Sequence, residues 1–323
     1  MDSSSYKRFT VSRGFEYSYY VRPAAPGKLT LLFVHGFPSF ATDWRLQVAF
    51  FEQKGYGLIV PDMLGFGGTS KPTDPTAYVA SLLAKDLVEI VDAEAVADVV
   101  AIGHDWGSYV VSRVANHSQD RFRGFSFLAV GYAPPTGVTV GQLREMTQKG
   151  LGYETLGYWE FFSAPEAPEI IKKHIDSFFD LLWAKDGRVW RYNLGPTGSL
   201  QNFLESDSRT PRVEAISTED YAESQKRLVE QGFEAPLCYY KAMTADLNSA
   251  NDKTIPQDKL FVTKPVLYLG AAHDAVAPPA IVRKSLELCP NHVSKVLDTG
   301  HWIMLEAADE VNAQIEAWLQ TIA

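Results

Sequence analysis

Short, mainly apolar runs recur along this chain and alternate with segments of helical character. The runs occupy residues 31–34, 58–60, 99–102, 125–128, 266–269 and 293–297. Continuous apolar runs of this length are typical of parallel strands that are buried on both faces of a sheet. Their alternation with helices predicts an α/β fold with a doubly wound, mostly parallel sheet flanked by helices. Residues 7–21, rich in Tyr, Phe and Val around Arg13-Gly14, predict a hairpin ahead of that sheet.

Two of the helices are predicted from the spacing of their apolar residues. In residues 78–91 the apolar side chains fall at positions 79, 82, 83, 87, 90 and 91, roughly one face of a helix. The last predicted helix carries a similar stripe, formed by Val311, Ile315, Trp318, Leu319 and Ile322. Both stripes indicate helices that pack on the sheet.

The stretch 136–256 breaks this alternation. It is rich in aromatic residues, has helical patterning, and is interrupted by prolines at 165, 168, 196 and 211. We expect a helical lid, inserted into a core formed by residues 1–135 and 257–323. Such an insertion leaves the sheet after one strand and returns before the next. Its natural position is above the carboxyl ends of the strands, where these sheets bind ligands.

The composition limits the partners and the location of the protein. A formal charge of −9 disfavours nucleic acid and anionic membrane surfaces, because both need a basic protein surface. The sequence has no amino-terminal signal pattern and no apolar run of about eighteen residues, so we expect no membrane span and a cytoplasmic location. Cys238 and Cys289 lie far apart without the spacing of a redox pair or a zinc motif, and we expect two buried thiols.

The most specific motif is Gly-His-Asp-Trp-Gly at residues 103–107, between the predicted strand 99–102 and a helical run at 109–115. A reactive residue on a tight turn from strand to helix, with small residues two before and two after it, is a nucleophile elbow. The central residue is Asp105, and Ser108 lies outside the required spacing. A carboxylate attacks sp³ carbon well, whereas acyl transfer to it would give an anhydride. The motif therefore predicts that Asp105 attacks an epoxide or an alkyl halide.

An elbow nucleophile needs an acid and a histidine, which follow it along the chain in that order. Asp274 follows the predicted strand 266–269, and His301 follows the last predicted strand. The other position for the acid, after the strand 125–128, offers no carboxylate. We therefore expect Asp274 to orient His301 as the general base, with His273 as a weaker competitor for the histidine.

A His-Gly-Phe-Pro turn at residues 35–38 follows the first of the buried strands. The backbone N–H groups of Phe37 and Trp106 can form an oxyanion hole for the tetrahedral intermediate of ester hydrolysis. We expect His35 to be a hydrogen-bonded structural residue. The glycine-rich segment 62–70 lacks the spacing of a phosphate-binding loop and is expected to support the floor of the site.

Together these segments resemble the soluble epoxide hydrolases of the α/β-hydrolase superfamily. The resemblance implies an α/β-hydrolase fold, with two lid tyrosines that hold the epoxide oxygen and protonate the alkoxide. Tyr158, in Tyr-Trp-Glu-Phe-Phe-Ser-Ala-Pro, and Tyr240, in Pro-Leu-Cys-Tyr-Tyr-Lys, match those tyrosines, and Tyr153 and Tyr239 compete with them. The family often has Gln after the first tyrosine, whereas this chain has Trp159. Substrate contacts are expected from Phe37, Trp106, Trp159, Tyr239 and Trp302.

The resemblance also implies a two-step hydrolysis of an epoxide to a vicinal diol. Asp105 would attack a ring carbon and form a covalent ester, which water activated by His301 and Asp274 would then hydrolyse. It implies no metal and no organic cofactor, and a small apolar epoxide and water as partners of a monomer or homodimer. The biological role that the resemblance implies is detoxification or the turnover of lipid epoxides.

Two other functions remain open from the sequence. A haloalkane or haloacid dehalogenase would use the same Asp105 ester. A departing halide needs side-chain N–H donors. Trp106 can supply one, Phe37 has no side-chain N–H, and Trp159 is a candidate second donor. Haloacid enzymes need arginines just after the nucleophile, where Trp106 and Tyr109 stand. A hydrolase-like binding protein without turnover is the other function, and the complete set of catalytic residues disfavours it.

Overall fold

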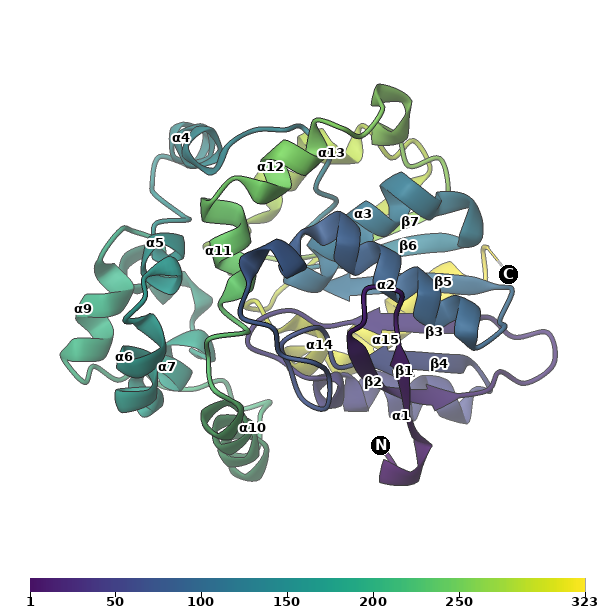
Figure 1. The fold of residues 1–323 in the computed structure, drawn as a ribbon, viewed down its shortest axis with the longest axis horizontal. Coiled ribbons are helices and arrows are strands. Elements are labelled where there is room, and N and C mark those ends of the chain that lie inside the picture. Colours follow the sequence, from purple (N-terminus) through teal and green to yellow (C-terminus); the bar gives the residue numbers. More distant parts are fainter. Residues whose placement is uncertain (323) are drawn as a thin grey trace.

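One eight-stranded sheet forms the centre of the protein in the computed structural model, which describes residues 1–322 (Figure 1). Its strands are β1 (Tyr6–Thr10), β2 (Glu16–Arg22), β3 (Thr30–Val34), β4 (Gly57–Pro61), β5 (Val99–His104), β6 (Gly124–Leu128), β7 (Val266–Ala271) and β8 (His292–Leu297). Their order is β1-β2-β4-β3-β5-β6-β7-β8, with β2 antiparallel to β1 and β4 and all other pairs parallel. The predicted hairpin and α/β fold class are confirmed.

Helices cover both faces of the sheet. On one face lie α2 (Ala80–Ala93) and α3 (Trp106–Ser118), and on the other α1 (Arg45–Gln53) and α15 (Ala308–Leu319) (Figure 1). The core also contains α13 (Pro279–Leu286) and the single-turn α14 (Ile303–Glu306). Both apolar stripes predicted from the sequence lie on observed helices, although Tyr78 belongs to a separate 3-10 turn before α2 and Ile322 lies beyond the end of α15.

The position of each strand in the sheet explains its composition. Every residue of β3, β4, β5, β6 and β7 is buried, because helices or other strands cover both faces. β8 differs, since it lies at one edge of the sheet, and its first five residues are exposed. Its sequence, His-Val-Ser-Lys-Val-Leu, contains Ser294 and Lys295 and suits an edge position better than a buried one.

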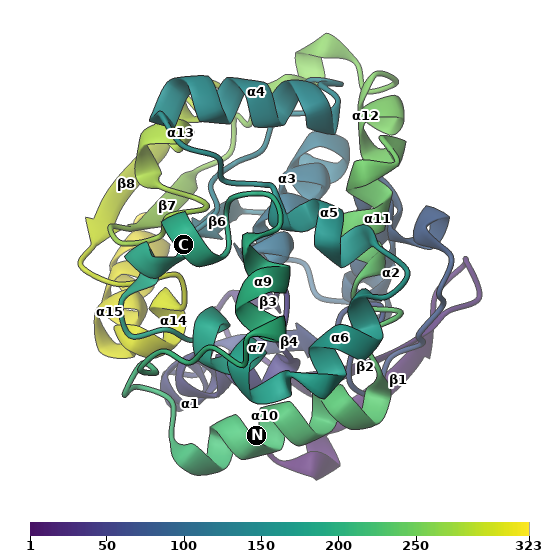
Figure 2. The ribbon, with the colours of Figure 1, turned by 90° about the vertical axis from the view of Figure 1, so that its left-hand side faces the viewer.

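The segment between β6 and β7 forms the lid. It consists of α4 (Val140–Leu151), α5 (Tyr158–Ser163), α6 (Ala167–Lys173), α7 (Ile175–Leu182), α8 (Trp190–Asn193), α9 (Ser199–Glu205), α10 (Thr218–Gln231), α11 (Cys238–Thr244) and α12 (Leu247–Asp252). Helices α5, α6, α7 and α9 gather at one end of the sheet in Figure 1 and face the viewer in Figure 2. The boundaries of the lid at residues 136 and 256 stay a prediction.

Both connections between lid and core are held by one residue of α3. Arg113 is 1% exposed and makes two hydrogen bonds to Asp252 at the end of α12, of 2.8 Å and 2.7 Å. The same guanidinium donates to the carbonyl oxygen of Ala133, where the chain leaves β6 for the lid, at 2.6 Å. Because α3 begins directly after Asp105, this ion pair ties the lid to the helix behind the predicted nucleophile.

Both cysteines are buried free thiols, as predicted. Burial raises the pKa of Cys238 to about 11 and that of Cys289 to about 12, so both remain protonated near neutral pH. Within residues 1–322 no helix is both long enough and apolar enough to cross a bilayer.

Candidate active site

The turn that carries Asp105 is strained, as a nucleophile elbow requires. Asp105 lies between β5 and α3 with φ 55° and ψ −123°, a backbone conformation that residues other than glycine rarely adopt. A Cβ atom on Gly107 would collide with the backbone of Val34, and one on Gly103 would collide with the backbone of Gly107. The two glycines therefore allow the tight turn from strand to helix, and the Asp105 side chain remains partly exposed at its tip.

The backbone of Phe37 holds one oxygen of this carboxylate. The Phe37 N–H donates to Oδ1 of Asp105 at 2.8 Å. Trp106 is the first residue of α3, a position whose N–H has no partner within the helix, so it can act as a second donor. In an Asp105 ester the oxygen beside Phe37 would carry the developing negative charge. The predicted oxyanion hole thus has one donor already in place.

His301 lies between Asp105 and a second, buried carboxylate, that of Asp274. Its Nδ1 lies 2.6 Å from Oδ2 of Asp274, and its Nε2 lies 3.5 Å from Oδ2 of Asp105. The other oxygen of Asp274 accepts hydrogen bonds from the N–H groups of Val276 and Ala277, both at 2.9 Å. Burial would raise the pKa of Asp274, but His301 and these two N–H groups outweigh it and lower the pKa. Asp274 is therefore a fixed carboxylate that orients the imidazole.

The charge state of His301 depends on both carboxylates. Burial alone would lower its pKa, whereas the charges and hydrogen bonds of Asp274 and Asp105 raise it to about 10. The free protein therefore holds an imidazolium between two carboxylates. Conversion of Asp105 into a neutral ester would remove one of these charges and lower the pKa of His301, which would make the imidazole available as a base.

Two tyrosines of the lid line the same cleft as Asp105. Tyr158 begins α5 and Tyr240 lies on α11, with 5.9 Å between their ring centroids. Burial, with the nearby Asp105 charge, raises the pKa of Tyr158. Burial, with Tyr158 and Asp105, raises the pKa of Tyr240 well above its usual range. Both hydroxyls stay protonated and can donate hydrogen bonds at neutral pH.

The competing tyrosines make other contacts. The Tyr239 hydroxyl donates to the carbonyl oxygen of Leu64 in the core at 3.1 Å, and the Tyr153 hydroxyl donates to that of Ala275 at 2.9 Å. Consecutive residues of a helix point in directions about 100° apart. The packing of α11 therefore turns Tyr240 toward the cleft and Tyr239 toward the core.

The walls of the cleft are largely apolar. They are formed by Phe37, Asp105, Tyr158, Phe162, Leu182, Trp190, Leu194, Tyr240, Val276, His301 and Trp302. Phe37 and Trp302, both expected as substrate contacts, are in this set. The two other expected tryptophans pack around Tyr240, with ring centroids at 5.1 Å for Trp106 and 6.1 Å for Trp159.

Several of these residues carry no signal in the sequence. Trp190 lies with its ring centroid 5.1 Å from that of His301, although more than a hundred residues separate them. Phe162, Leu182 and Leu194 are apolar lid residues like many others. Only their proximity in the folded chain reveals the contacts.

The other histidines near the site have structural partners. Nε2 of His35 accepts a hydrogen bond from the N–H of Met63 at 2.9 Å, in agreement with its expected structural role. His273, the predicted competitor of His301, is exposed and pairs with Asp298 at 2.7 Å. No group of three or more His, Cys, Asp or Glu side chains in the described part of the chain is arranged to hold a metal ion.

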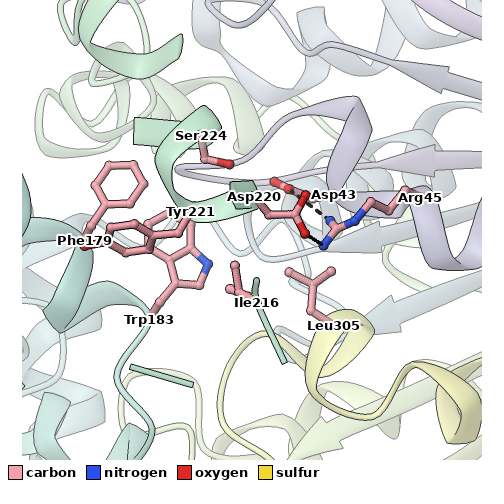
Figure 3. Close-up of a pocket in the computed structure, with 9 residues that line it drawn as sticks. All are labelled: Asp43, Arg45, Phe179, Trp183, Ile216, Asp220, Tyr221, Ser224 and Leu305. Carbon is pink, nitrogen blue, oxygen red and sulfur yellow. Dashed lines mark hydrogen bonds and ion pairs between the residues drawn. The ribbon is translucent and has the colours of Figure 1, made fainter. Parts of the chain in front are cut away.

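A second pocket lies at the seam between lid and core (Figure 3). Arg45 of α1 pairs with Asp220 of α10 at 2.6 Å, and Asp43 lies beside the same guanidinium. Trp183 lines this pocket and stacks on Trp302, with centroids 4.8 Å apart, so the two rings stand between the pocket and the cleft. The ion pair between Arg45 and Asp220 thus joins α1 of the core to α10 of the lid across this pocket.

Known proteins share this architecture. Epoxide hydrolase srdG of Neurospora crassa is 25% identical over 302 residues, covering 90% of this chain and 86% of that protein. Bifunctional epoxide hydrolase 2 of Mus musculus is 26% identical over 297 residues, covering 90% of this chain, which spans about half (51%) of the mouse protein. The solved epoxide hydrolase from an endophytic Streptomyces is similar in fold, with a TM-score of 0.82 at 23% identity, covering 98% of this chain and 95% of that one.

A family model described as alpha/beta hydrolase fold matches residues 30–308, which include β3 to β8, the lid, Asp105, Asp274 and His301. The observed sheet order, the insertion after β6 and the strained turn at Asp105 agree with that match. This chain therefore belongs to the α/β-hydrolase fold family.

Proposed function

We propose that this protein hydrolyses small apolar epoxides to vicinal diols. The observation that carries the proposal is the juxtaposition of an aspartate nucleophile with two protonated tyrosines in one apolar cleft. The hydroxyl groups of Tyr158 and Tyr240 suit an oxygen leaving group, because they can donate hydrogen bonds and then a proton. The names of the curated relatives support the same activity.

In the first step an oxygen of Asp105 forms a bond to an epoxide carbon, and the bond between that carbon and the ring oxygen breaks. The ring oxygen takes a proton from one of the two tyrosines. Phe37 already binds Oδ1, which leaves Oδ2 as the attacking atom. After the ring has opened and the ester has formed, the imidazolium of His301 can return a proton to the tyrosine through water. This transfer leaves a neutral ester, neutral tyrosines and a neutral imidazole before hydrolysis begins.

In the second step His301 takes a proton from a water molecule, which attacks the carboxyl carbon of the ester. The negative charge that develops on Oδ1 is stabilised by the N–H of Phe37, with Trp106 as the second donor. The bond between the carboxyl carbon and the oxygen that Asp105 supplied then breaks, and this oxygen takes the remaining proton of the water as the diol leaves. Asp105 regains its charge, and His301 returns to the imidazolium form.

The dehalogenase alternative is less well supported by the contacts. Release of a halide would need the indole N–H groups of Trp106 and Trp159 to face the leaving group. The Trp106 and Trp159 rings both pack around Tyr240, which lines the cleft together with Tyr158. The indole N–H of Trp159, which has no hydrogen-bond partner among the described residues, would suit a halide. Tyr158 and Tyr240, however, line the same cleft and can donate a proton, which an oxygen leaving group needs and a halide does not.

The test is product formation from styrene oxide by the purified protein, with Asp105→Ala as the inactive control. We expect diol from the wild-type protein and none from the variant. A parallel incubation with a bromoalkane measures bromide release. Bromide without diol would favour the dehalogenase, and thermal stabilisation by the epoxide without any product would favour a binding protein. The cytoplasmic location and the monomer or homodimer remain predictions.

A further inference from the structure

The backbone on both sides of His301 is bound by a single carboxylate, that of Glu306. Oε2 of Glu306 accepts a hydrogen bond from the N–H of Gly300 at 2.7 Å, and Oε1 accepts one from the N–H of Trp302 at 3.0 Å. Glu306 ends α14, the single helical turn that follows His301, so its side chain reaches back to the start of its own turn. Two hydrogen bonds to a charged acceptor thus hold the peptide groups that flank the catalytic histidine.

Further contacts complete this support. Nε2 of His104 lies 2.8 Å from the carbonyl oxygen of His301, and the Trp302 indole N–H donates to the carbonyl oxygen of Leu182 in the lid at 2.8 Å. A Cβ atom on Gly300 would lie 2.9 Å from Oε1 of Glu306, so a side chain at position 300 would displace the carboxylate. Glycine at this position therefore permits the close approach of Glu306.

This carboxylate is half-buried, and its partial removal from water needs a compensating interaction. Burial raises the pKa of Glu306, while the two N–H groups and the charge of His301 oppose the increase. No Lys or Arg of residues 1–322 forms an ion pair with Glu306. Its hydrogen bonds are both directed at the His301 turn, and neither step of the proposed reaction uses Glu306 directly.

We propose that Glu306 is a positioning residue, which fixes His301 against Asp105 and Asp274 and thereby sets the rate of ester hydrolysis. The inference rests on the proposed function. Nε2 of His301 must face the carboxyl carbon of Asp105 through one water molecule, and its Nδ1 must keep the 2.6 Å hydrogen bond to Asp274. Rotation or displacement of the turn would disturb both contacts, whereas attack by Asp105 would proceed with the tyrosines unchanged.

Two variants test this role from opposite sides of the same contact. Glu306→Gln keeps the shape of the side chain but places an amide group, itself a donor, against one backbone N–H. Gly300→Ala keeps the carboxylate and displaces it. The matched control is Glu310→Gln, because Glu310 is an exposed carboxylate nearby that pairs with Lys295.

We expect both test variants to form the Asp105 ester at the wild-type rate and to hydrolyse it about 10- to 100-fold more slowly. Rapid mixing with excess styrene oxide, followed by intact mass spectrometry, measures the two steps separately. Glu310→Gln should match the wild-type protein in both. A folded Glu306→Gln or Gly300→Ala protein that hydrolyses the ester at the wild-type rate would overturn the inference, as would equal slowing of both steps.

A second measurement needs no substrate. The proton shared by His301 and Asp274 should give a far-downfield proton NMR resonance, which His301→Gln would identify by its loss. We expect this resonance to shift or broaden in both test variants and to be unchanged in Glu310→Gln. An unchanged resonance in both test variants would overturn the inference. If the wild-type protein forms neither ester nor diol from epoxides, the proposed function fails, while this spectrum still decides whether Glu306 positions His301.

Discussion

Oδ2 of Asp105 lies 3.5 Å from Nε2 of His301. The imidazole is thus in contact with the free oxygen of the nucleophile, while Phe37 binds the other oxygen. In the proposed mechanism the two carboxylate oxygens have separate tasks, and His301 activates the water that attacks the carboxyl carbon of Asp105. The proposed chemistry therefore divides into an attack that depends on Asp105 and the tyrosines, and a hydrolysis that depends on His301.

Replacement of His301 by Gln should block the second step and spare the first. We expect ester hydrolysis to slow roughly 100- to 10,000-fold, the usual contribution of a general base, so that the covalent ester accumulates. Intact mass spectrometry after incubation with an epoxide measures the ester. His273→Gln is the matched control, since His273 is exposed and pairs with Asp298. A folded His301→Gln protein with neither ester nor turnover would contradict the assigned role.

Replacement of Tyr158 or Tyr240 by Phe should slow ring opening. Loss of one donor to a developing oxyanion costs about 100-fold or more, so the double variant should be nearly inactive. The rate of ester formation under single-turnover conditions measures the effect. Tyr239→Phe is the control, because its hydroxyl donates to Leu64 in the core. If Tyr239→Phe slowed ring opening while Tyr240→Phe did not, the second donor would be Tyr239.

Neutralisation of Asp105 should lower the pKa of His301. In the wild-type protein the pKa is raised to about 10 by Asp274 and Asp105 against the effect of burial. Asp105→Asn removes one carboxylate, as ester formation would, and so favours the neutral imidazole. NMR titration of the His301 ring should therefore give a lower pKa in the variant. Asp298→Asn, which changes a carboxylate beside His273, should leave it unchanged.

The pH dependence of ester hydrolysis follows from the same charges. His301 must be neutral to accept a proton from water, so hydrolysis should rise with pH through the pKa of His301 in the ester. That pKa should be lower than the value of about 10 in the free protein, because the ester carries no charge at Asp105. Stopped-flow measurement of ester decay across pH gives the curve. A rate that falls as pH rises through this range would argue against a neutral imidazole base.

Labelled water distinguishes the ester route from direct attack of water on the epoxide. With enzyme in excess and ¹⁸O-labelled water, the diol of the first turnover should be unlabelled, because its new oxygen comes from Asp105. Label should instead appear in the peptide that contains Asp105, and in the diol only over later turnovers. Labelled diol in the first turnover, with no label in that peptide, would falsify Asp105 as the nucleophile.

The attachment of the lid predicts a stability difference between two Asp→Asn variants. Asp252→Asn leaves the buried Arg113 without its charged partner, which should cost about 3–5 kcal/mol of unfolding free energy. Asp98→Asn removes an exposed partner of Arg123, worth about 0–1 kcal/mol. Urea unfolding measures both values. Equal values for the two variants would show that the Arg113 pair does not stabilise the lid.

The sequence alone determined the fold class and the predicted nucleophile. Apolar runs and helical stripes depend on local periodicity, and β8 is the one strand whose exposure they did not indicate. The elbow at Asp105 is also local, because its glycines and its flanking strand lie within a few residues. Asp274 and His301 followed from the order of strand ends along the chain, since parallel strands bring their carboxyl ends to one edge of the sheet.

Only the tertiary structure decided which lid side chains face the cleft. Tyr239 and Tyr240 are adjacent on α11, and the sequence could not choose between them because that depends on how the helix packs on the core. Arg113 and Asp252 are charged residues that a sequence pattern assigns to the surface, yet they pair in the interior. The contact of Trp190 with His301 likewise joins distant parts of the chain. Such contacts are fixed by the packing of lid on core, and local sequence patterns carry no record of that packing.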